Sequence, residues 1–191
     1  MKKVLTLSLV IALILSGCSN GKSIQRGNWN SGNTVFTNKW SALKLTVPDG
    51  FTALTDNELP VFFETLRQDP MIGVHLPYER LTFDAVITND SGTGLWLVYE
   101  DITETVLNAD ILNGGIETDE DIINGVSQMR GFTGIATQTL AGKTWTRLGF
   151  YNNYGELNWR LFFRTTENVR FGIVLLYNDE ADAKRLISAI E

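Results

Sequence analysis

Four consecutive segments in the last third of the chain have the composition of β-strands and are separated only by short turns. They cover roughly residues 134–140, 144–151, 156–165 and 169–177. Connections this short can join only antiparallel neighbours, because parallel strands need a crossover of a dozen or more residues. The sequence therefore predicts an antiparallel meander, and this meander restricts the possible folds more than any other feature.

Cap and turn signals place the other elements around this meander. The predicted elements are strands at 35–38 and 42–47, a helix over 59–66 behind the capping box of Thr55 and Glu58, a strand pair at 83–88 and 95–99, a short helix at 103–113, a helix behind the cap Thr118, and a last helix behind Asn178 or Asp179. Residues 68–80 are expected to form a long connection. This order predicts an α+β fold, in which an antiparallel β-sheet is flanked by helices.

The amino terminus carries the pattern of a secretory signal. The basic pair Lys2-Lys3 precedes an apolar run from Val4 to Leu15, which is shorter than the roughly 20 residues that a membrane-spanning helix needs. Leu15-Ser16-Gly17-Cys18 closes this run and resembles the lipobox of bacterial lipoproteins, and Cys18 is the only cysteine. The resemblance implies that residues 1–17 are removed as a signal peptide and that Cys18 becomes acylated.

Acylation of Cys18 would fix both the location and the chemistry of the chain. Two or more fatty chains such as palmitate anchor a protein stably, whereas one chain binds only marginally. We therefore expect an extracytoplasmic lipoprotein on the cell membrane, or on the outer membrane if the source has one. With its one cysteine acylated, the chain has no thiol for disulfides, cysteine-ligated zinc or a cysteine nucleophile.

Residues 18–33 are rich in Ser, Asn and Gly and are predicted to be a flexible tether, followed by a single domain over 34–191. Removal of the signal takes away two lysines and moves the net charge from −6 to −8. Residues 18–48 carry four bases and no acid, whereas residues 49–142 carry sixteen acids and three bases. The acidic middle argues against nucleic-acid binding, and the basic segment suits an anionic membrane surface.

A fold resemblance rests on the opening strand pair and its exit. The pattern Leu43-x-Leu45-x-x-Pro48-x-Gly50-Phe51, followed by a helix and closed by a meander and a carboxy-terminal helix, resembles the Mog1p/PsbP-like fold. The likeness covers most of residues 34–191 as an order of elements. It implies a binding or assembly factor and carries over no catalytic residue and no cofactor.

The meander also predicts a candidate ligand site. If residues 152–155 form a four-residue loop, Arg147 faces Arg160, because antiparallel partners keep a constant sum of positions. One face then carries Trp145, Arg147, Tyr151, Asn158, Arg160, Phe162 and Arg164, with Arg170 placed beside Arg164, and the other carries Leu148, Phe150, Leu157, Trp159, Leu161 and Phe163. Arginine forks beside aromatic rings suit an anionic or planar ligand, such as an anionic small molecule, a glycan or a protein. The alternative is that acidic residues of 49–142 cover this face and pair with the arginines.

Other motifs favour structural roles. Asp119-Glu120-Asp121 are explained by helix capping and the helix dipole better than by a metal, and His75 is a lone histidine that cannot build a metal site of several histidines. No metal site is expected. Trp29 and Trp40 suit either the lipid headgroup layer or, for Trp40 above all, packing on the sheet edge.

The leading hypothesis is a membrane-anchored, non-enzymatic binding or assembly module. The alternative is a cell-envelope hydrolase that acts on a glycan or peptide with carboxylates such as Asp84 or Glu100, and a purely structural spacer is a third possibility. Two carboxylates that face each other in a pocket, about 5–10 Å apart, would favour the enzyme.

Overall fold

The computed structural model describes residues 24–68, 81–102, 118–128, 131–151, 157–166 and 169–191. The small sheet consists of β1 (Asn28–Trp29), β2 (Val35–Asn38) and β3 (Leu43–Thr46) in that order. The large sheet has the order β4 (Thr52–Ala53), β5 (Leu81–Thr88), β6 (Gly94–Asp101), β10 (Val169–Tyr177), β9 (Asn158–Thr166), β8 (Lys143–Phe150) and β7 (Phe132–Leu140). The helices of the described residues are α2 (Leu59–Gln68), α3 (Asp119–Ser127) and α4 (Glu180–Ser188).

All strand pairs in both sheets are antiparallel, so the predicted α+β fold is confirmed. The predicted strands and the helices behind Thr55, Thr118 and Asp179 are found with small shifts at their ends. The two-residue strands β1 and β4 were not predicted. The predicted helix at 103–113 and nearly all of the predicted connection at 68–80 lie outside the described residues.

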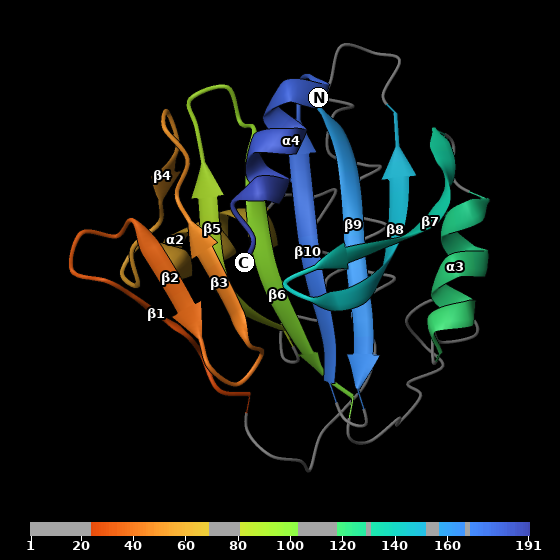
Figure 1. The fold of residues 1–191 in the computed structure, drawn as a ribbon, viewed down its shortest axis with the longest axis horizontal. Coiled ribbons are helices and arrows are strands. Elements are labelled where there is room, and N and C mark those ends of the chain that lie inside the picture. The colour runs from red at the N-terminus through yellow and green to blue at the C-terminus, as the bar shows by residue number, and fades with distance from the viewer. Residues whose placement is uncertain (1–23, 69–80, 103–117, 129–130, 152–156, 167–168) are drawn as a thin grey trace.

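The large sheet is covered on both faces, and its side chains divide into two cores. Leu59 of α2 and Ile122 of α3 share one core with Val86, Trp96 and Val174 of the sheet. The other core packs the small sheet and α4 against the opposite face; its members include Phe36, Leu45, Ala85, Leu97, Ile173 and Leu186. Figure 1 shows the small sheet and α4 in front of the large sheet and α2 behind it. Strand β10 lies between both layers, and all nine of its residues are buried.

The register of the meander differs from the prediction in two places. Arg147 pairs with Phe162, and Arg160 pairs with Gly149, so β8 and β9 are shifted by two residues. A shift of two keeps every side chain on its face, and the predicted division between the faces is confirmed by the two cores. Arg170 pairs with Thr165 instead of Arg164. This shift of one residue moves Arg170 to the opposite face, so its predicted place beside Arg164 is wrong.

The predicted boundary between tether and domain also needs correction. Asn28 and Trp29 pair with Thr37 and Phe36 as strand β1, and the backbone N–H of Gly27 donates to the buried Asp84 at 2.8 Å. The chain from residue 24 onwards therefore belongs to the folded unit. Residues 18–23 of the predicted tether lie outside the described part.

Helix ends follow the predicted caps. The Thr118 hydroxyl accepts from the backbone N–H of Asp121, and the Asp121 carboxylate accepts from the backbone N–H of Thr118, which completes a capping box. Asp179 accepts from the backbone N–H groups of Ala181 and Asp182. Of the helices in the described ranges, none is both long enough and apolar enough to cross a membrane.

Candidate functional site

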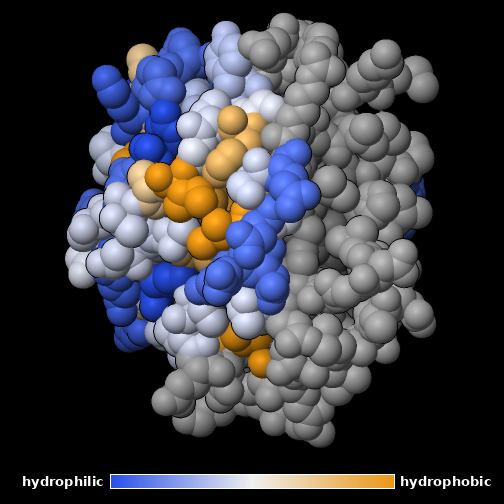
Figure 2. All heavy atoms as spheres, turned by 90° about the vertical axis from the view of Figure 1, so that its right-hand side faces the viewer, coloured by the Kyte–Doolittle hydropathy of each residue, from blue (hydrophilic) through white to orange (hydrophobic). Residues whose placement is uncertain are grey.

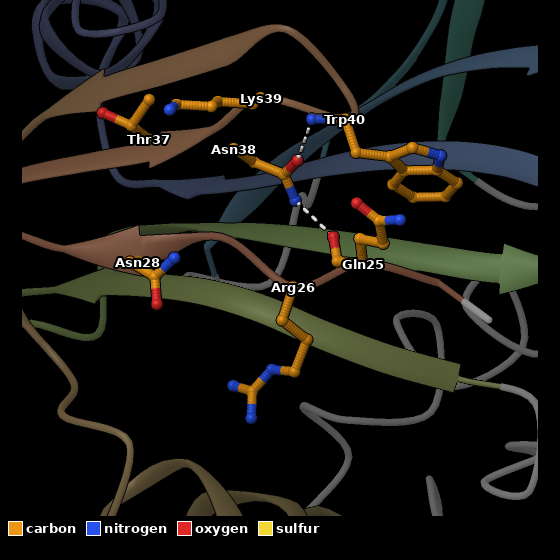
Figure 3. Close-up of a pocket in the computed structure, with 7 residues that line it drawn as sticks. All are labelled: Gln25, Arg26, Asn28, Thr37, Asn38, Lys39 and Trp40. Carbon is orange, nitrogen blue, oxygen red and sulfur yellow. Dashed lines mark hydrogen bonds between the residues drawn. The ribbon is translucent and has the colours of Figure 1, made fainter.

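A polar pocket lies where the chain enters the small sheet. Its volume is about 370 Å³, and it is lined by Gln25, Arg26, Asn28, Thr37, Asn38, Lys39 and Trp40. Figure 3 shows that these residues come from two neighbouring segments, the chain that leads into β1 and the end of β2 with its turn. We call residues 24–30 the entry strap and this cavity the strap pocket.

Close backbone approach holds the entry strap against β2. A Cβ atom at residue 27 would lie 2.3 Å from a ring carbon of Phe36 and 2.7 Å from the carbonyl oxygen of Thr37. Only glycine fits there without displacing the strap, because atoms this close overlap. Gly27 therefore sets the distance between the two walls of the pocket.

Asn38 organises the opposite wall. Its side-chain oxygen accepts from the backbone N–H groups of Trp40 at 2.8 Å and Ser41 at 3.0 Å, which fixes the turn after β2. Its side-chain nitrogen donates to the carbonyl oxygen of Gln25 at 2.8 Å, as the dashed lines in Figure 3 show. One buried amide thus joins the turn to the entry strap.

A buried carboxylate accepts hydrogen bonds from both walls of the pocket. Asp84 is 2% exposed; its two oxygens accept from the backbone N–H of Gly27 at 2.8 Å and from the Asn38 side chain at 2.7 Å. Asp84 lies between Phe83 and Ala85, where the register of the β5–β6 pairing shifts and Asp84 has no partner residue on β6. Burial raises the pKa of Asp84, although its hydrogen-bond partners and the charge of Arg26 act in the opposite direction.

The two cationic side chains of the pocket differ in their carboxylate partners. The Arg26 guanidinium lies 3.9 Å from Asp84 and 3.8 Å from Asp56, so two carboxylates share it. Lys39 also lines the pocket and is exposed, and no described residue forms an ion pair with it. The Lys39 ammonium group is therefore the charge that an incoming anion would meet.

Trp40 closes one end of the pocket and is held by aromatic neighbours. Its ring centroid lies 5.4 Å from that of Tyr99 in an edge contact and 5.3 Å from that of Phe171. Trp40 therefore packs on the large sheet, as predicted, but over its central strands β6 and β10 and not at its edge. The Tyr99 hydroxyl donates to the Ser41 hydroxyl at 3.1 Å, and burial raises the pKa of Tyr99.

The residues of the predicted arginine face form two separate groups in the structure. Trp145 is fully buried, and its ring nitrogen donates to the carbonyl oxygen of Leu140. The Arg164 guanidinium lies between the rings of Trp145 and Phe171, at 5.2 Å and 4.1 Å from their centroids. It also donates to the carbonyl oxygen of Ser41 at 3.3 Å. Trp145 and Arg164 are brought together, but they serve the packing of two turns against the sheet.

Arg147, Arg160 and Tyr151 lie further along the same face. Arg160 donates to both oxygens of Glu180 on α4, at 2.5 Å and 2.7 Å, and lies 4.9 Å from the ring centroid of Tyr177. Arg147 is half-buried and has no ion pair with the residues described, and Tyr151 is 57% exposed at the end of β8. A ligand on this face would meet Arg147 first and would compete with Glu180 for Arg160.

Arg170 forms a separate buried ion cluster on the opposite face. It lies 2.9 Å from Glu100 and 3.5 Å from Asp119, and Asp119 also accepts from the Thr165 hydroxyl. Acidic residues of 49–142 thus pair with Arg170, but on the face opposite the one that the alternative expected them to cover. On the predicted face, Arg160 pairs with Glu180 of α4, which lies outside that range. The cluster joins the start of α3 to β9 and β10.

The candidate catalytic carboxylates do not face each other. Asp84 points towards the small sheet, while Glu100 shares the opposite face with Arg170. Within the described ranges, no group of three or more His, Cys, Asp or Glu side chains is placed to hold a metal ion. Asp119 and Asp121 are engaged in the ion cluster and in the capping box, and His75 lies outside the described residues.

Hydrophobic side chains are exposed on the side where α3 and β7 lie. Figure 2 shows them between polar side chains and next to atoms drawn in grey. Ile135 of β7 is 48% exposed, and the neighbouring Ile123 and Phe132 are partly buried against the core.

Sequence reasoning found the arginine face but not the strap pocket. Gln25, Asn28, Thr37 and Asn38 carry no motif, and the glycine of the entry strap is also typical of a flexible linker. The signal that pointed to this region was the run of bases without an acid between residues 18 and 48.

Comparisons with known proteins give a structural likeness but no match in sequence families. No family model matches the chain, and no curated protein matches it. The solution structure of cyanobacterial PsbP (CyanoP) from Synechocystis sp. PCC 6803 is similar, with 11% sequence identity and a TM-score of 0.43 over 92% of this chain and 97% of that chain. The α+β architecture rests on the strand pairing described above.

Proposed function

We propose that the protein is a non-enzymatic binding module, held at the outer surface of a membrane by acyl chains on Cys18. Its ligand is a small polar molecule with a negative charge, and the ligand lies in the strap pocket. The observation that carries this proposal is the exposed Lys39 in a cavity of about 370 Å³, beside polar side chains that have no hydrogen-bond partner among the described residues. The lipobox-like sequence before Cys18 supports the anchor.

The pocket offers suitable groups for such a ligand. The side chains of Gln25, Asn28 and Thr37 line the cavity, and no described residue hydrogen-bonds to them. Amides and hydroxyls both donate and accept, so they can recognise an oxygen-rich ligand. The walls are held by Asp84 and Asn38 before a ligand arrives. A preformed site reduces the entropy lost on binding.

A role in binding is favoured over hydrolysis by the placement of the carboxylates. The hydrolase alternative needs two carboxyl groups on either side of a substrate. The carboxylate at the strap pocket, Asp84, is buried, and both its oxygens are occupied by Gly27 and Asn38. Glu100 lies on the other side of the sheet with Arg170.

Charge reversal at Lys39 tests the proposed function. The full chain with Cys18→Ala, in non-ionic detergent micelles, is titrated with inorganic phosphate and with glucuronate while tryptophan fluorescence is recorded, because Trp40 lines the pocket. We expect saturable binding of at least one of these anions and a loss of about tenfold or more in Lys39→Glu, since a favourable charge contact becomes repulsive.

Lys184→Glu is the matched control, because Lys184 is an exposed lysine on α4. It makes the same change in net charge away from the pocket and should bind like the parent protein. Equal affinity in the two variants, or no saturable binding of any anion, would contradict the proposed function.

A further inference from the structure

We infer that the ligand of the strap pocket is the phosphodiester headgroup of an anionic phospholipid. This inference rests on the proposed function and names the ligand class for the same site. The lipid would belong to the membrane that anchors the protein, so the pocket would bind a headgroup of that same membrane.

The charge of the pocket fits a single negative charge. Arg26 is shared by Asp56 and Asp84, which leaves Lys39 as the cation without a carboxylate partner among the residues described. A phosphodiester carries one negative charge at neutral pH. A phosphate monoester carries between one and two, and the second charge would have no free cation. A phosphodiester is therefore matched better than a free phosphate.

The neutral groups of the pocket fit the rest of such a headgroup. Gln25 and Asn28 lie on the entry strap, and Thr37 lies on β2, so hydrogen-bonding groups stand on both walls. A hydroxylated alcohol such as glycerol, esterified to the phosphate, presents donors and acceptors to both walls at once. A simple carboxylate would leave most of these groups without a partner.

The size and polarity of the pocket exclude the acyl chains. Its volume of about 370 Å³ is near the lower end of the range for small-molecule sites, about 300–1,000 Å³. Six of its seven lining residues are polar, four of them uncharged and two cationic, and Trp40 is the one large apolar side chain. A lipid would therefore insert its headgroup and keep its fatty chains in the membrane.

The position of the pocket in the chain favours this ligand over a free one. Gln25 follows Cys18 by seven residues, which span at most about 25 Å when fully extended. An acylated Cys18 would thus keep the pocket within reach of the headgroup layer. Tethering raises the effective concentration of headgroups at the pocket to the millimolar range or above, so a weak intrinsic affinity is sufficient.

A titration with soluble headgroups tests the ligand class. The full chain with Cys18→Ala in non-ionic micelles is titrated with glycerophosphoglycerol, inorganic phosphate and glucuronate, with tryptophan fluorescence as the readout. We expect the phosphodiester to bind about fivefold or more tightly than either other anion, and Lys39→Glu and Lys39→Ala to lose about tenfold. Lys184→Glu should bind like the parent.

A second experiment tests whether the pocket binds the headgroup of a lipid in a micelle as well as a free anion. Micelles that contain phosphatidylglycerol should give the same fluorescence change, and micelles with phosphatidylcholine should give less, because its choline adds a positive charge near Lys39. The change with phosphatidylglycerol should disappear in Lys39→Glu but persist in Lys184→Glu. Thermal unfolding of each variant, followed by circular dichroism, shows that the fold is retained.

The outcomes separate this inference from the proposed function. Binding of phosphate or glucuronate with equal or weaker binding of the phosphodiester would overturn the headgroup assignment and leave the proposed function standing. Binding of none of the three anions would overturn both. Phosphodiester binding that is unchanged in both Lys39 variants would place the ligand outside the strap pocket and also overturn the inference.

Discussion

Asp84 shows how one buried carboxylate can hold a surface site in shape. It was a candidate catalytic residue by sequence, yet both of its oxygens accept hydrogen bonds from the two walls of the strap pocket. Breaking a buried charged hydrogen-bond network by removing one partner costs far more than losing an exposed pair. The role that follows for Asp84 is to position the entry strap.

Asp84→Ala should therefore destabilise the protein and release the strap. The change leaves the N–H of Gly27 and the amide of Asn38 without their acceptor, and we expect a loss of about 2–4 kcal/mol in the free energy of unfolding. Urea denaturation measures the loss. Trypsin cleavage after Arg26 should also become faster, because the bond is no longer held against the sheet.

Asp90→Ala is the control for this change, because Asp90 is exposed in the turn between β5 and β6. It should shift stability by no more than about 0.5 kcal/mol. If the two variants unfold at the same urea concentration and are cut at the same rate, Asp84 does not position the strap.

Residue-level prediction from sequence succeeded where the signal was local. The cap at Thr118 is set by a side chain three residues from its partner. Arg170 was misplaced because its side depends on a single-residue difference in register between β9 and β10. Both faces of β10 are apolar apart from this arginine, so its sequence pattern could not fix the register.

At the scale of elements, α3 is stabilised by contacts of its first turn. Its amino-terminal end carries a capping box between Thr118 and Asp121, and Asp119 contacts Arg170 of β10. Acidic residues near a helix amino terminus interact favourably with the helix dipole. The predicted structural role of the acidic cluster is thus confirmed by its contacts.

Thr118→Ala should cost about 1 kcal/mol of stability, because the backbone N–H of Asp121 loses its acceptor. Chemical denaturation followed by circular dichroism measures the change. Ser127→Ala alters a hydroxyl at the other end of the same helix, where the side chain only donates to the carbonyl oxygen of Asn124. It should be close to neutral, and an equal loss in both variants would argue against the cap.

Most elements could be predicted from the sequence, while the site could not. Strands with apolar runs and helices with caps have local patterns, so their order and the α+β fold followed from the chain. Strands β1 and β4 contain two residues each and exist only through pairing with β2 and β5. The strap pocket lies between the chain that leads into β1 and the end of β2 with its turn, and no local pattern marks a strand as short as β1.

At the scale of the whole molecule, the proposed anchor and the folded unit are joined by a short stretch of chain. Only residues 18–23 separate the candidate acylation site from the described structure. Directly after this stretch, Ile24 packs against the core and the entry strap hydrogen-bonds to Asp84 and Asn38. The membrane and the strap pocket would therefore be neighbours.

Intact-mass measurement of the native protein tests this arrangement. We expect residues 1–17 to be absent and Cys18 to carry fatty acyl chains, because the preceding residues resemble a lipobox. Cys18→Ala should lack the acyl mass, and Ser19→Ala should keep it. A mature wild-type chain with an unmodified Cys18 would contradict anchoring by lipid.

The two ends of the described chain meet in the small sheet. Glu191 exchanges backbone hydrogen bonds with Lys44 at the open edge of β3, while β1 covers the edge of β2. A ribosome makes β1 more than 150 residues before Glu191, so the sheet that bears the pocket cannot be complete until Glu191 has been made. If the chain is moved across a membrane during synthesis, it would pass before the strap pocket is complete, and the pocket would form on the far side.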